Sequence, residues 1–109
     1  MRGSGTATLT VDERHLNPNG VVHGGVPYAM VDTAMGAATM SVLAEDQVCA
    51  TIEIHTRYLA RCVGGTLTAT ATVRRAGRRI VHLAATVTDQ DGTEIVLATG
   101  SFAVLSPPT

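Results

Sequence analysis

The chain has 109 residues, of which 45% are hydrophobic and 16% are charged, enough to bury the core of one domain. A net charge of −1 and an aromatic content of 3% argue against nucleic-acid binding, which needs basic residues and stacking platforms. Two cysteines are too few for a disulfide framework or a four-cysteine zinc site. Because no apolar run suits a membrane span or a signal peptide, we expect one cytoplasmic domain over residues 1–109, with loose ends at 1–5 and 106–109.

The first expected element is a strand over residues 6–11, where polar and apolar residues alternate with a period of two. A loop rich in asparagine, proline and glycine follows over residues 12–25. Loops of this length are uncommon in small domains and often carry function. This loop is therefore the first candidate for a functional segment.

A long helix is expected over residues 26–44. Pro27 suits its first turn, where a missing N–H costs nothing. The segment is apolar almost all round, so we expect it to be buried on most sides. Gly36 in its middle costs about 1 kcal/mol relative to alanine, which indicates that another element packs closely there.

The remaining strands are expected at residues 48–58, 66–73, 80–88 and 93–105. Short turns join the last three into an antiparallel meander. Together these elements predict an α+β domain in which a curved sheet wraps one central helix. The outer sheet face, which carries Ile80 and Ala84, is expected to be too apolar for water, and we therefore expect at least a dimer.

The junction between the loop and the helix carries the main chemical signal. A helix N-terminus presents unpaired N–H groups, and Gly24 and Gly25 let a substrate approach them closely. Such groups polarise a carbonyl or stabilise an oxyanion, and Asn17 could add a neutral donor. Asp32 lies about two turns into the apolar helix, where a lone carboxylate needs partners. It is either a base or nucleophile, or a structural group that caps a loop or pairs with an arginine.

This arrangement resembles the hotdog-fold acyl-CoA thioesterases of the phenylacetate-pathway (PaaI-like) and 4-hydroxybenzoyl-CoA type. The resemblance starts with N-x-x-G-x-x-H-G-G at residues 17–25, followed by Asp32. It continues through I-E-I-H-T-R-Y-L at 52–59, G-x-L-x-A-x-A-x-V at 65–73, G-R-R at 77–79 and D-x-D-G at 89–92. It implies an α+β hotdog fold and hydrolysis of the thioester of a short, medium-chain or aryl acyl-CoA.

The resemblance also implies residue roles. The Gly24 N–H would polarise the thioester carbonyl with help from Asn17, and Asp32 would act as general base or nucleophile. Thr51 would orient the water, and His23 would chiefly position the loop, with direct proton transfer as the alternative. Asn17, His23 and Gly24 of one subunit would face Asp32 of the other. The geometry agrees, because eight helical residues span about 12 Å, too far for Gly24 and Asp32 of one chain to meet at one carbonyl.

The substrate is expected to bind between helix and sheet at the dimer interface. The expected lining residues are Gly25, Val26, Met30, Met35 and Tyr58. Candidates for the coenzyme A phosphates are Arg57, Arg61, Arg78 and Arg79, each with a solvated surface charge as the alternative. No cofactor is expected, because coenzyme A is part of the substrate. The histidine spacing predicts no metal site. The expected partners are acyl-CoA and further copies of the chain, as a homodimer or dimer of dimers, with no nucleic acid and no membrane.

Two other functions are possible on the same fold. An enoyl-CoA hydratase would pair an aspartate with a histidine in one D-x-x-x-x-H loop, which the chain lacks. A non-catalytic acyl-CoA binding or sensor protein would bind without turnover. The set of Asn17, Gly24 and Asp32 favours hydrolysis. The chain departs from the resembled family at Ala60 and Arg61, where relatives often have Arg-Pro, which alters the coenzyme A contact expected there.

Overall fold

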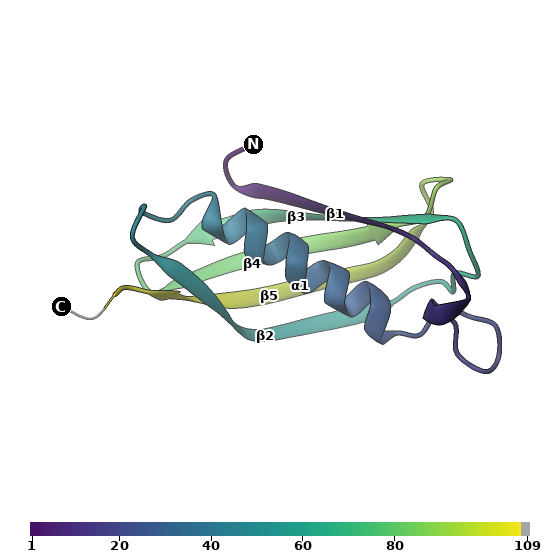
Figure 1. Ribbon diagram of the computed structural model, residues 1–109. Helices are drawn as coiled ribbons and strands as arrows, with labels where there is room; N and C mark the ends of the chain where they lie inside the picture. The colour runs from purple at the N-terminus through teal and green to yellow at the C-terminus, as the bar shows by residue number, and fades with distance from the viewer. Residues whose placement is uncertain (108–109) are drawn as a thin grey trace.

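One helix lies across one face of a five-stranded antiparallel sheet in the computed structural model, which describes residues 1–107 (Figure 1). The elements in chain order are β1 (Ser4–Thr10), the 3-10 helix η1 (Glu13–His15), α1 (Gly25–Met40), β2 (Val48–Tyr58), β3 (Thr66–Ala76), β4 (Ile80–Thr88) and β5 (Glu94–Leu105). The strand order β1-β3-β4-β5-β2 confirms the predicted meander and leaves β1 and β2 as the two edges.

Alternation along the central strands builds the core. The inward residues of β3 and β4 are buried, whereas the threonines of β3 lie on the opposite face. The inward residues pack beneath the buried side of α1. The main members of this core are Met30, Val31, Ala34, Met35, Ala38, Leu67, Ala69, Ala71, Val81, Leu83, Ala85 and Val87. Burial of this apolar surface fixes the helix on the sheet.

The helix ends at Met40 rather than at the expected residue 44. Ser41 caps it, because the Ser41 hydroxyl donates to the Ala38 carbonyl at 2.6 Å and accepts the Gly3 N–H at 2.7 Å. This contact orders the start of the chain. The expected loose segment 1–5 is therefore wrong in part, since β1 already begins at Ser4. At the other end, residues 108–109 of the expected loose tail lie outside the described residues.

The close contact expected at Gly36 is found at Gly5 instead. A Cβ at Gly36 would meet only the Phe102 ring, at an ordinary 3.8 Å. A Cβ at Gly5 would lie 2.7 Å from the Ala38 backbone nitrogen and would also clash with the Ala34 carbonyl oxygen. Glycine at position 5 is what allows β1 to cross the helix backbone this closely.

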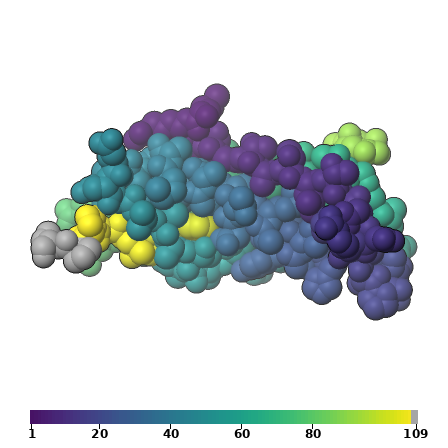
Figure 2. Space-filling model, viewed as in Figure 1, coloured from purple at the N-terminus to yellow at the C-terminus, as the bar shows by residue number. Residues whose placement is uncertain are grey.

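Two expectations about buried surfaces are wrong for the single chain. Figure 2 shows α1 open to the surface along its length, between β1 and β2, and its exposed residues are Gly25, Tyr28, Ala29, Thr33, Ala37 and Met40. The outer sheet face is also less apolar than expected, because threonines accompany Ile80, Ala84 and Leu97 on it. Within residues 1–107, no helix is both long and apolar enough to cross a membrane.

Candidate active site

The loop before α1 is folded around Asn17. The Asn17 Oδ1 atom accepts the N–H groups of Asn19 at 2.9 Å and Val21 at 3.2 Å, and the Asn17 N–H donates to the Val21 carbonyl at 2.8 Å. The Asn17 side-chain oxygen is thus used to hold its own turn, as asparagine commonly does. Only the side-chain NH₂ group is left as the neutral donor expected from the sequence.

His23 accepts hydrogen bonds from the first N–H groups of the helix. Its Nδ1 atom accepts the Gly25 N–H at 2.9 Å, and its carbonyl accepts the Val26 N–H at 2.9 Å. The His23 N–H in turn donates to the His15 carbonyl at the end of η1, at 2.8 Å. Within residues 1–107 the half-buried Gly24 makes no hydrogen bond through its N–H. The start of the helix therefore has one N–H donor without a partner in these residues, and it belongs to Gly24, the glycine that the sequence predicted as the donor.

Asp32 lies two turns further along α1 and is half-buried. The Thr51 hydroxyl of β2 donates to Asp32 Oδ1 at 2.6 Å. The ion pairs found in residues 1–107 involve Asp12 with Arg14 and His15, so pairing of Asp32 with an arginine is not observed. The Asp32 carboxylate is therefore held at the open side of the helix by a neutral hydroxyl.

Cys49, two residues before Thr51, lies on the same side of β2. It is paired with Val104, as Thr51 is with the inward-facing Phe102. Partial burial, and secondarily the nearby Asp32 carboxylate, raise the pKa of the Cys49 thiol. The Asp32 carboxylate therefore lies close enough to act electrostatically on the Cys49 thiol.

A β-bulge allows β2 to reach both ends of this site. The pairing with β5 shifts register between Thr51 and Glu53. Thr51 is paired with Phe102 and Tyr58 with Val96, and both β5 residues face the core. Because Thr51 and Tyr58 are an odd number of residues apart, a regular strand would turn them to opposite faces. The extra residue of the bulge brings both onto the helix side.

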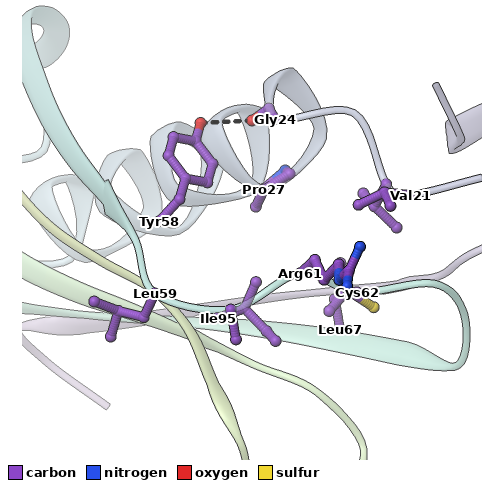
Figure 3. A pocket seen from close by; sticks show the side chains of 11 residues that line it. Val21, Gly24, Pro27, Tyr58, Leu59, Arg61, Cys62, Leu67 and Ile95 are labelled. Atoms are coloured by element: carbon purple, nitrogen blue, oxygen red, sulfur yellow. Dashed lines mark hydrogen bonds between the residues drawn. The ribbon is translucent and has the colours of Figure 1, made fainter. Parts of the chain in front are cut away.

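A cavity of about 410 Å³ opens beside the helix N-terminus (Figure 3). In Figure 3 the Tyr58 side chain rises from the end of β2, and its hydroxyl donates to the Gly24 carbonyl at 2.6 Å. The lining is mostly apolar and consists of Val21, Val22, Gly24, Pro27, Tyr58, Leu59, Ala60, Arg61, Cys62, Leu67 and Ile95. Sequence reasoning missed most of these residues, because the segment 59–62 follows β2 without any periodic pattern.

The expected acyl pocket is divided by the helix. Tyr58 lines the cavity, but Gly25, Val26 and Met30 lie in a separate depression between α1 and β1. Met35 is fully buried against Gly100 in the core, so it lines no open surface. Within a single chain these residues therefore do not form one pocket, and the pocket expected at a dimer interface stays a prediction.

The four candidate arginines are also separated. Arg61 lines the cavity. Arg57 is paired with Leu97 on the outer sheet face, where both border a different depression. Arg78 and Arg79 lie in the β3–β4 turn, and the Val104 N–H donates to the Arg79 carbonyl, whereas the cavity lies beside Ile95, about 30 Å back along β5. Of these four arginines, only Arg61 lines the cavity of its own chain.

The fold and the site together agree with a known family. The model of the Thioesterase superfamily matches residues 19–96, and the chain belongs to this superfamily. Its structure is the predicted hotdog fold. Within residues 1–107 no group of three or more histidine, cysteine or acidic side chains is arranged to hold a metal ion.

Particular relatives extend this similarity. A Haemophilus influenzae protein named as an esterase is 36% identical over 74 residues, which cover 68% of this chain and 54% of that protein. A Bacillus halodurans protein crystallised with coenzyme A superposes with a TM-score of 0.90 at 29% identity, covering 94% of this chain and 68% of the other. The Escherichia coli PaaI protein of the phenylacetic acid degradation operon gives 0.88 at 26% identity, covering 96% and 75%. The chain spans about half the length of the first curated relatives that it matches.

Proposed function

We propose that the protein hydrolyses the thioester bond of an acyl-CoA, at a site that combines Gly24 of one copy with Asp32 of another. The uncommitted Gly24 N–H beside the cavity is the observation that carries this proposal, because such a donor stabilises the oxyanion of acyl transfer. Membership of the thioesterase superfamily and the similarity to a protein crystallised with coenzyme A support it.

In the proposed reaction water adds to the thioester carbonyl carbon. Asp32 takes the proton from water, with its carboxylate oriented by Thr51, and the Gly24 N–H binds the developing oxyanion. The carbon–sulfur bond then breaks, and the proton passes to the leaving thiolate. The products are a free acid and coenzyme A. No cofactor takes part in these steps.

Two features support a site shared by two copies. Gly24 and Asp32 are about 12 Å apart along one helix, too far to act on one carbonyl. Among residues 1–107 no strand pairs with the outer edge of β2, which exposes Val48 and Ile52, each about half accessible. A second copy added at this edge would also cover the open side of α1, on which Asp32 lies. The proposed active unit is therefore a homodimer, alone or within a dimer of dimers.

The cavity supports a short, medium-chain or aryl acyl group, because its lining is mostly apolar and its volume is about 410 Å³. Arg61 is the candidate for the anionic groups of coenzyme A from the same chain. Arg57, Arg78 and Arg79 would contribute only from another copy.

The test begins with a panel of acyl-CoA substrates and a thiol reagent that detects released coenzyme A. We expect hydrolysis by the native protein and a fall of about 10²–10⁴-fold for Asp32→Ala, the usual effect of losing a general base. Absence of thiol release above background on every substrate would refute the proposed activity.

Mixing two inactive variants tests the shared site. Asp32→Ala is combined with Gly24→Pro, which lacks the N–H, under conditions that allow subunits to exchange. Half of the dimers are then mixed and each contains one intact site, so activity should recover to roughly a quarter of the native value. Recovery that stays at the level of the separate variants would show that both groups act within one chain.

A further inference from the structure

The peptide group between Gly24 and Gly25 is held at both of its polar ends. Its oxygen accepts the Tyr58 hydroxyl at 2.6 Å, and its N–H donates to His23 Nδ1 at 2.9 Å. The helix itself adds only a long hydrogen bond at this point, since the Tyr28 N–H donates to the same oxygen over an N···O distance of 3.4 Å. The orientation of the first helical turn is therefore set by side chains from β2 and from the loop.

Two adjacent glycines need such a restraint. Without side chains they have the greatest backbone freedom of any residues, so a free Gly-Gly segment would sample many peptide orientations. A donor that stabilises an oxyanion contributes most when it is fixed before the charge develops. The neighbouring peptide is also held, because the His23 carbonyl accepts the Val26 N–H. Only the Gly24 N–H is left without a partner in residues 1–107.

We propose that Tyr58 is a positioning residue for the Gly24 donor: its hydroxyl locks the Gly24–Gly25 peptide and thereby fixes the direction of the adjacent N–H. This inference rests on the proposed function. The Tyr58 ring lines the cavity, but the hydroxyl is committed to the Gly24 carbonyl. Tyr58 therefore acts through the backbone, whereas the sequence predicted a direct contact with substrate.

The test uses Tyr58→Phe, which removes the hydroxyl and keeps the ring. The control is Thr6→Val, which also removes a hydroxyl: Thr6 is exposed on β1, lines neither the cavity nor the open side of α1, and makes no side-chain hydrogen bond within residues 1–107. For Tyr58→Phe we expect kcat to fall about tenfold, which corresponds to about 1.4 kcal/mol, with KM unchanged. Thr6→Val should match the native protein in both constants. Both variants are compared per folded molecule, with thermal unfolding recorded alongside.

A second measurement does not depend on activity. Amide proton exchange, followed by NMR at Gly24 and Gly25, should accelerate about fivefold or more at Gly25 in Tyr58→Phe, while core amides of β4 keep their native rates. If the native protein hydrolyses no acyl-CoA but this acceleration is seen, the positioning role stands and the proposed function fails. Unchanged exchange at Gly25, or a native kcat in Tyr58→Phe, would overturn the positioning role.

Discussion

Gly24→Pro is the most selective change that the structure offers at the proposed oxyanion site. Gly24 has φ of −57°, which proline adopts without strain, and its N–H makes no hydrogen bond within residues 1–107. A Cβ at this position would lie 3.4 Å from the Tyr58 ring, an ordinary contact. The substitution therefore deletes one donor and is compatible with the native φ at the helix start.

The expected loss follows from the role of that donor. Removing one hydrogen bond to an oxyanion lowers kcat by about 10²–10³-fold, or about 3–4 kcal/mol of transition-state stabilisation. KM should change little, because the donor acts mainly on charge that develops during the reaction. The assay is steady-state release of coenzyme A from the best substrate of the panel, with circular dichroism to confirm the fold.

Gly24→Ala is the matched control, since it adds the same Cβ but keeps the N–H. It should retain most of the native kcat. A native kcat in Gly24→Pro would refute the assignment of the Gly24 N–H as the donor. An equal loss in both variants would show that the added carbon, and not the missing N–H, is responsible.

Two further predictions concern Asp32 and the core. Thr51→Val removes the hydroxyl that donates to Asp32 at 2.6 Å, so kcat should fall about 5- to 30-fold in the thiol-release assay, and a Thr51→Ser variant equally impaired would contradict this role. Gly5→Ala should lower the free energy of unfolding by about 1–3 kcal/mol in denaturant titrations at fixed protein concentration, because the added Cβ meets the helix backbone. Gly64→Ala is its control, since that position has open space, and equal stability of the two variants would refute the packing argument.

Local patterns were sufficient to predict much of the fold. The alternation of Leu67, Ala69 and Ala71 with threonines gave β3 its buried face, and the turn at residues 89–92 gave the β4–β5 hairpin. Such features are readable because side-chain direction and turn geometry depend on neighbours in sequence. The same holds for the glycines at the helix start, since a helix N-terminus always leaves N–H groups unpaired.

Contacts between distant segments could not be predicted from local sequence patterns. The close approach to the helix backbone falls at Gly5 and not at Gly36, because the path of β1 across the helix decides it. The predicted pocket residues lie on two sides of α1. The helical periodicity of the sequence does not indicate which side of the helix faces which edge of the sheet.

The elements, their order in the meander, and the combination of a glycine-rich helix start with a carboxylate two turns later all follow from local sequence patterns. Which side chains contact that helix start and that carboxylate depends on how distant segments pack. The bulge in β2 changes the alternation between Thr51 and Glu53, and so turns both Thr51 and Tyr58 toward α1, while Arg57 faces outward. One inserted residue in a strand reverses the direction of all residues after it, and only the pairing with β5 reveals where that reversal occurs.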